Sequence, residues 1–170
     1  MKIFYWSPFS SNIATIHAVL NSAKSLKKYG KTYYPTIINV NGEWDRYKSK
    51  LDLNILDLNK NKINNLIENR GYFSSRLISI FTFFQSFLKL KKLLKEKKPD
   101  YLIIHLITFV PILIFLLFNL RTKLILRISG YPKLTIFRKL LWKEINKVIY
   151  KVTCPSISTM NELQKQQIFQ

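Results

Sequence analysis

Acidic residues are scarce in this sequence. Its 170 residues include nine Asp and Glu against 28 Lys and Arg, so the formal net charge is +19 at pH 7. A surface with this balance favours anionic partners, which include acidic lipid headgroups, nucleic acid and phosphate-bearing substrates.

Cysteine is almost absent as well. The one cysteine, Cys154, excludes an internal disulfide, and its apolar surroundings in the sequence predict a buried structural thiol in a reducing compartment. The N-terminus lacks the long apolar core and the small-residue cleavage site of a signal peptide. We therefore expect a cytoplasmic protein.

Several motifs that would identify a chemistry are missing. The sequence has no Walker loop, HExxH, CxxC pair or GxSxG. The segment SPFSSN at 7–12 contains no glycine, which excludes the GxGxxG fingerprint of dinucleotide-binding proteins at this point. Without a helix-turn-helix, zinc finger or RNP-type motif, nucleic acid is disfavoured as a partner. No cofactor or metal is expected, because no cluster has metal-ligand spacing.

Short apolar segments alternate with helical patterns along the chain. Strands are predicted at 2–6, 33–40, 51–56, 101–106, 123–129 and 151–154. Helices are predicted at 13–28, ending before Gly30, at 72–98, 111–119 and 133–149, and from near Ser156 or Ser158, with NGEWD (41–45) as a loop. This alternation predicts one α/β domain over 1–170, a Rossmann-like parallel sheet with helices on both faces.

The segment 101–120 has two interpretations. Its twenty mostly apolar residues are long enough to cross a bilayer, and a membrane hairpin of 73–94 and 101–120 would follow. However, Pro111 divides the segment into a β-rich half and a Leu/Ile/Phe half. A buried strand followed by a buried helix explains the same residues, and we prefer that interpretation.

Candidate site residues follow from the rule that ligands of open α/β sheets bind at the carboxyl ends of the strands. After the first strand come Ser7, Ser10, Ser11 and Asn12, which either cap the next helix or contact a substrate. The later strands contribute Ser129, Gly130 and Tyr131, and then Ser156.

Two charged or titratable residues stand out among apolar neighbours. His105 ends a predicted central strand, and we interpret it either as a general base or as a buried histidine. Arg127 lies in the next strand, where it needs either an exit to the ligand crevice or an anionic partner, which would be a phosphate or one of the few carboxylates. The other histidine, His17, is predicted to pack on the first helix.

Lysines are grouped beside very apolar helices. The run KLKKLLKEKK (89–98) follows the apolar segment 76–88, and Lys139, Lys143 and Lys147 form a stripe at i, i+4 spacing. A helix that is basic on one side and rich in Phe and Leu on the other is typical of a membrane surface. We expect peripheral association with the anionic inner face of the cytoplasmic membrane.

The order of these motifs resembles a known family. SPFSSN, then KKPDYLIIHL, KLILRISGYP and VTCPSISTMNEL, is similar to the N-terminal, acceptor-side domain of family-4-type glycosyltransferases with the GT-B fold. The resemblance covers essentially the whole chain. It implies sugar transfer from a nucleotide-sugar donor to a glycan or lipid-linked acceptor, in cell-surface polysaccharide synthesis, with retention and without a metal. His105 and the 7–12 turn would then face the acceptor, and Arg127 to Tyr131 would line the inter-domain cleft.

Two departures from the family pattern matter. The first turn is rich in serine, whereas the family's turn is rich in glycine. A C-terminal donor-binding domain with paired glutamates is absent from this sequence, so we expect that domain in cis or as a separate chain, and little activity from this chain alone. The alternative hypothesis is a non-enzymatic basic module that binds membranes or nucleic acid.

Overall fold

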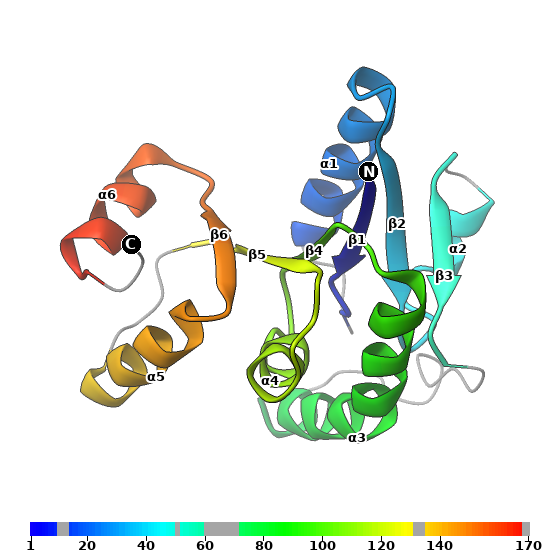
Figure 1. The fold of residues 1–170 in the computed structure, drawn as a ribbon. Coiled ribbons are helices and arrows are strands. Elements are labelled where there is room, and N and C mark those ends of the chain that lie inside the picture. Colours follow the sequence, from blue (N-terminus) through cyan, green and yellow to red (C-terminus); the bar gives the residue numbers. More distant parts are fainter. Residues whose placement is uncertain (10–13, 50–51, 60–71, 131–134, 168–170) are drawn as a thin grey trace.

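The sheet is six-stranded and entirely parallel, as predicted. The structure is a computed structural model that describes residues 1–9, 14–49, 52–59, 72–130 and 135–167. Its strands are β1 (Lys2–Trp6), β2 (Tyr34–Asn39), β3 (Asn54–Asp57), β4 (Tyr101–Ile104), β5 (Lys123–Arg127) and β6 (Ile149–Thr153). They are ordered β3-β2-β1-β4-β5-β6, and β3 forms an edge (Figure 1).

Helices follow the strands in alternation, which confirms the Rossmann-like α/β prediction. They are α1 (Thr15–Tyr29), α2 (Asp45–Lys48), α3 (Tyr72–Lys97), α4 (Phe109–Leu117), α5 (Ile136–Asn146) and α6 (Ile157–Lys165). The predicted bounds agree within a few residues, but the short helix α2 begins inside a predicted loop. Side-chain hydrogen bonds to the backbone, described below, hold that segment, and hydrophobic periodicity does not show them.

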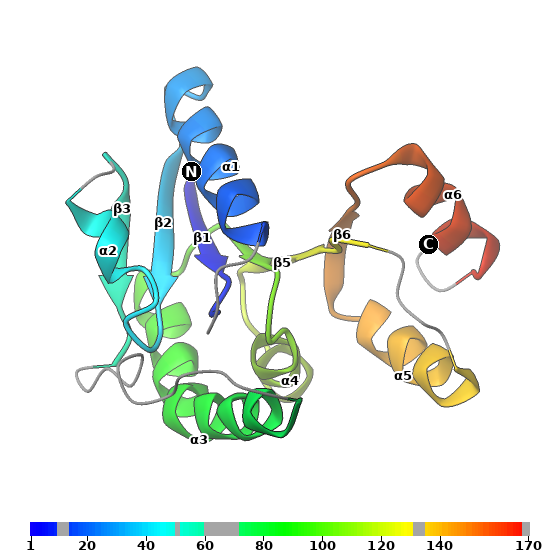
Figure 2. The same ribbon diagram turned by 180° about the vertical axis from the view of Figure 1, so that it is seen from behind.

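Two apolar clusters lie on opposite faces of the sheet. The first joins the sheet to α3 and α4 and includes Trp6, Leu94 and Ile104, all at most 1% exposed. The second joins the other face to α1 and includes Tyr5 and Ala23. Figures 1 and 2 show α1 on one side of the sheet and α3 with α4 on the other, while α5 and α6 flank β6 at the end. Helices therefore cover both faces.

The apolar segment 101–120 folds as a strand and a helix. β4 takes its first residues, and α4 begins at Phe109 with Pro111 in its first turn, where proline is tolerated. The membrane-hairpin interpretation is therefore wrong. Among the described residues, no helix is both long enough and apolar enough to cross a membrane.

Gly30 ends α1, as predicted, but for a different reason from the usual one. Its φ is −104°, which any residue adopts, so it does not supply a left-handed cap. A Cβ at this position would lie 2.0 Å from the Tyr33 ring. The close approach of the Tyr33 side chain therefore requires glycine here.

Candidate functional site

The strand order creates a topological switch point between β1 and β4. From β1 the chain continues outward to β2 and β3, and then returns to add β4, β5 and β6 on the other side of β1. In open α/β sheets, ligands bind outside the carboxyl ends of the strands at this point. The residues that follow β1 and β4 are therefore the first candidates.

Ser7 and His105 occupy those two positions. The His105 backbone N–H donates to the Trp6 carbonyl at 3.0 Å, which holds the two strand ends together. Ser7 is 1% exposed and His105 is 5% exposed. Within the described part of the chain, the Ser7 Oγ and both ring nitrogens of His105 have no hydrogen-bond partner. Such orphaned polar groups are rare in folded proteins, and a ligand is one way to satisfy them.

Arg127 lies beside His105 at the end of β5. The β4–β5 register pairs Ile104 with Leu126, so the next residues along, His105 and Arg127, are neighbours. Burial first, and the positive charge of Arg127 second, lower the pKa of His105 to about 4. The imidazole is therefore neutral at pH 7.

The guanidinium of Arg127 reaches back to α1. Its Nη1 donates to the Ala18 carbonyl at 3.3 Å. In the described ranges it forms no ion pair with a carboxylate, which was one of the two partners considered for it. The charge of Arg127 is thus available to an anionic ligand at the carboxyl ends of the strands.

Helix α1 forms one wall of this site. The hydroxyls of Tyr5 and Ser22 are 2.9 Å apart, which ties β1 to the helix, and burial raises the pKa of Tyr5. The Oγ1 of Thr15, in the first turn, is buried and lacks a partner among the described residues. His17 is exposed, so the prediction that it packs inside is wrong.

The turn after His105 is strained. Ile107 has a φ of 46°, which is unfavourable for a β-branched residue. The Trp6 Nε1 donates to the Ile107 carbonyl at 3.0 Å and holds this turn against β1. Strain of this kind concentrates at functional sites in proteins.

The remaining predicted residues that the structure describes are exposed. Ser129 and Gly130 follow β5 and are exposed, and a Cβ at Gly130 would meet open space. Ser156 caps α6, where its Oγ accepts the Thr159 N–H at 3.2 Å. Ser10, Ser11, Asn12 and Tyr131 lie outside the described residues. Among the predicted set, the structure thus brings together Ser7, His105 and Arg127.

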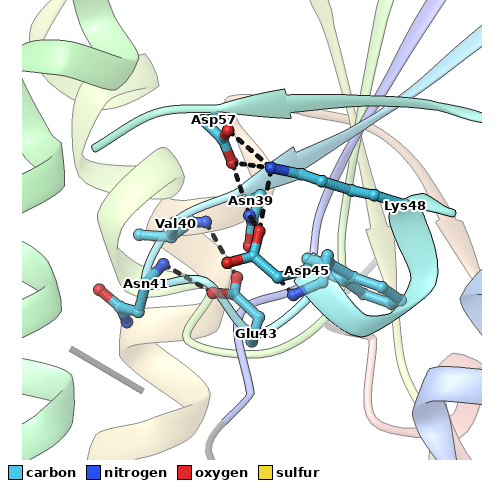
Figure 3. A network of polar contacts seen from close by, with 8 residues as sticks. Asn39, Val40, Asn41, Glu43, Asp45, Lys48 and Asp57 are labelled. Atoms are coloured by element: carbon cyan, nitrogen blue, oxygen red, sulfur yellow. Dashed lines mark hydrogen bonds and ion pairs between the residues drawn. The ribbon is translucent and has the colours of Figure 1, made fainter. Parts of the chain in front are cut away.

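A polar network at the carboxyl ends of β2 and β3 was not predicted (Figure 3). At its centre, Glu43 is 2% exposed and accepts the N–H groups of Val40 and Asn41 at 3.0 and 2.6 Å. Burial raises the pKa of Glu43 to about 7. Because each carboxylate oxygen accepts a backbone N–H, Glu43 holds the turn before α2, and we assign it no catalytic role.

The outer part of the network joins β2, α2 and β3. The Asn39 amide donates to Asp45 at 2.8 Å and to Asp57 at 2.6 Å, and Lys48 pairs with both carboxylates. The sequence does hold a signal for it, because Glu43, Asp45 and Asp57 are three of the nine acidic residues within a short stretch.

A pocket of about 330 Å³ lies at the far end of the sheet, between α5, β6 and α6. Its lining includes Tyr150, Met160 and Cys154, whose thiol is free and half-buried, in contrast to the buried thiol expected. Burial raises the pKa of Cys154. Since β4 and β5 separate β6 from β1, this pocket is distinct from the switch point at Ser7.

Comparisons with known proteins show the fold. No protein-family model and no curated protein matches the sequence. One similar solved structure is described as a UDP-N-acetylglucosamine 2-epimerase from Listeria monocytogenes. The match covers 98% of this chain and 42% of the epimerase chain, with a TM-score of 0.62 and 11% sequence identity. A second is CalG4, the calicheamicin glycosyltransferase. The match covers 96% of this chain and 41% of the CalG4 chain, with a TM-score of 0.51 and 12% sequence identity. The chain therefore has a Rossmann-like fold that matches one half of GT-B-type proteins and spans about two fifths of these two.

Proposed function

We propose that this chain is the acceptor-side half of a family-4-type GT-B glycosyltransferase. The observation that carries the proposal is the pair of buried, unpartnered polar side chains, Ser7 and His105, at the switch point of a GT-B-like half. The reaction would transfer a sugar from a nucleotide-sugar donor to a hydroxyl of a glycan or lipid-linked acceptor. A donor-binding domain, in cis or as a separate chain, is part of the proposal.

The chemistry of Ser7 and His105 suits a sugar hydroxyl. A neutral imidazole offers one donor and one acceptor nitrogen, and the Ser7 hydroxyl can do both, so the two residues can orient a hydroxyl group. In the transfer, the acceptor oxygen forms a bond to the anomeric carbon, the bond from that carbon to the nucleoside diphosphate breaks, and the hydroxyl proton passes to the departing diphosphate. With a pKa of about 4, His105 is a weak base. We therefore propose that it positions the acceptor hydroxyl by hydrogen bonding.

Arg127 would bind an anionic group near that hydroxyl. Its charge is not matched by a carboxylate in the described part of the chain, and guanidinium groups bind phosphate in a bidentate manner. Either a phosphate of the donor or an acidic group of the acceptor fits this position.

Acceptor binding by the chain can test the proposal. The wild-type chain and the His105→Ala and His17→Ala variants would be applied to an array of free and lipid-linked glycans. Removing a hydrogen-bonding partner from a buried site costs about 1–3 kcal/mol, so His105→Ala should weaken binding about 5- to 150-fold. His17 is exposed on α1, and its replacement should leave binding unchanged. Equal binding by the two variants, or no glycan binding by the wild type, would overturn the proposal.

A further inference from the structure

Large apolar side chains are exposed along one side of α3 and at the end of α4. On α3, Ile80, Phe84 and Leu88 follow one another at i, i+4 spacing and so share a helix face. Phe84 is 77% exposed and Leu88 is 69% exposed. At the end of α4, which packs beside α3, Leu116 and Leu117 are also exposed. We call these five residues the α3–α4 surface.

Lysines border this surface. The second half of α3 and the residue after it, from 89 to 98, carry six lysines and one glutamate. The Nζ atoms of Lys91 and Lys95 lie 3.7 and 5.9 Å from the centre of the Phe118 ring, just after α4. Lys92 and Lys95 are exposed. Apolar side chains and positive charges therefore lie side by side at the α3–α4 pair.

We propose that the α3–α4 surface docks on a membrane that contains anionic phospholipids. The headgroup region of such a membrane accepts lysine ammonium groups, and the acyl chains beneath it accept Phe and Leu side chains. A second copy of this chain is the poorer partner, because it carries the same net charge of +19 and would be repelled.

The position of the α3–α4 surface connects membrane docking to the proposed function. This connection rests on that function. The first half of α3 lies at the carboxyl edge of the sheet, since the Asn41 amide, just after β2, donates to Thr82 at 3.2 Å. In the same region, Phe83 stacks on Phe109, the first residue of α4. Docking through Phe84 would thus hold the edge that carries Ser7 and His105 close to the bilayer, where a lipid-linked acceptor would be found.

Co-sedimentation with vesicles tests the docking. The probes are vesicles of phosphatidylcholine alone and of phosphatidylcholine mixed with phosphatidylglycerol. We expect binding to the mixed vesicles, and loss of at least about tenfold in affinity for Phe84→Ser/Leu88→Ser, because two apolar side chains can no longer insert. The matched control is Tyr29→Ser/Ile157→Ser, which removes side chains that are 76% and 74% exposed on α1 and α6. The control should bind as the wild type does.

A second pair of variants isolates the position of the charges. Lys92→Gln/Lys95→Gln and Lys24→Gln/Lys143→Gln remove the same net charge, from α3 and from α1 with α5 respectively. We expect the α3 pair to weaken binding to the mixed vesicles more than the control pair does, and added salt to weaken both.

Several results would overturn the docking proposal. The wild type could bind neither kind of vesicle, or could bind both equally. A test pair of variants and its control could lose the same amount of vesicle affinity. Sedimentation velocity could show self-association that Phe84→Ser/Leu88→Ser abolishes. Glycan binding in solution separates this failure from that of the proposed function. A chain that binds glycans through His105 but does not bind vesicles would overturn the docking alone.

Discussion

Two buried residues at the carboxyl edge of the sheet have pKa values shifted in opposite directions. Burial raises the pKa of Glu43 from 4.5 to about 7, and burial with the charge of Arg127 lowers that of His105 from 6.5 to about 4. Between pH 4.5 and 7 the folded chain holds a proton on Glu43 that the unfolded chain has lost. Between pH 4 and 6.5 the unfolded chain holds a proton on His105 that the folded chain lacks. Glu43 therefore makes the free energy of unfolding fall as pH rises, and His105 makes it rise.

We predict that single variants expose these opposed effects. In Glu43→Gln, the free energy of unfolding should rise by an amount on the order of 3 kcal/mol from pH 4 to 6.5, because only the His105 effect remains. In His105→Gln it should fall by a similar amount from pH 4.5 to 7. Urea denaturation over this pH range measures both.

Exposed residues of the same types provide the controls. Glu96→Gln on α3 and His17→Gln on α1 should keep the pH profile of the wild type. Profiles of the same slope for Glu43→Gln and His105→Gln would contradict the opposed shifts.

For single residues, the sequence predicts where a side chain lies in the sheet better than it predicts which atoms that side chain contacts. The predicted strand ends placed Ser7, His105 and Arg127 at the carboxyl edge, and the structure confirms those positions. The partner of Arg127 could not be predicted, because the nearest acceptor, the Ala18 carbonyl, is distant in sequence. The role of Glu43 was missed for a different reason, since its partners Val40 and Asn41 are close in sequence but apolar periodicity does not show side-chain bonds to the backbone.

Among the helices, α6 has the clearest sequence signal for the residue at which it begins. Ser156 precedes the helix in an extended conformation, and its Oγ accepts the Thr159 N–H. The sequence predicted a helix start here from the serine. The same approach did not find α2, which is a single turn held by side-chain bonds from Asn39 and Glu43 to the backbone. Short helices of this kind have no apolar period that a sequence pattern can show.

The Ser156 cap of α6 gives a prediction about the stability of that helix. Ser156→Ala should lower the free energy of unfolding by about 1 kcal/mol, because the Thr159 N–H loses its acceptor. Ser156→Asp should keep most of the stability, since aspartate caps helices well. The control is Ser158→Ala, an exposed position inside α6, with a change within about 0.5 kcal/mol. Thermal unfolding measures all three, and a Ser156→Ala variant as stable as the Ser158→Ala control would exclude a capping role.

For the whole molecule, charge is the dominant property. A net charge of +19 on 170 residues implies self-repulsion in the folded state, while the ion pairs in the described part of the chain lie mainly on the surface and contribute little. We predict that salt raises the melting temperature, because screening of the repulsion outweighs the loss of surface pairs. Each kcal/mol gained corresponds to about 2–4 °C for a chain of this size.

Charge reversal tests the cause of the salt effect. Lys24→Glu/Lys31→Glu replaces two exposed lysines and lowers the net charge. Its melting temperature should depend less on salt than that of the wild type. A melting temperature that falls with salt in the wild type would show that attractive pairs dominate instead.

The class of fold, and the edge of the sheet that carries the candidate site residues, could be predicted from the amino-acid sequence alone. Both follow from local patterns, because the period of apolar residues distinguishes strand from helix, and strand–helix alternation requires parallel strands. Three features became known from the folded chain alone. The strand order brings the ends of β1 and β4 together, Arg127 lies beside His105, and Phe84 and Leu88 of α3 face outward. The physical reason is that these features depend on pairing and packing between residues far apart in the chain, which no local pattern specifies.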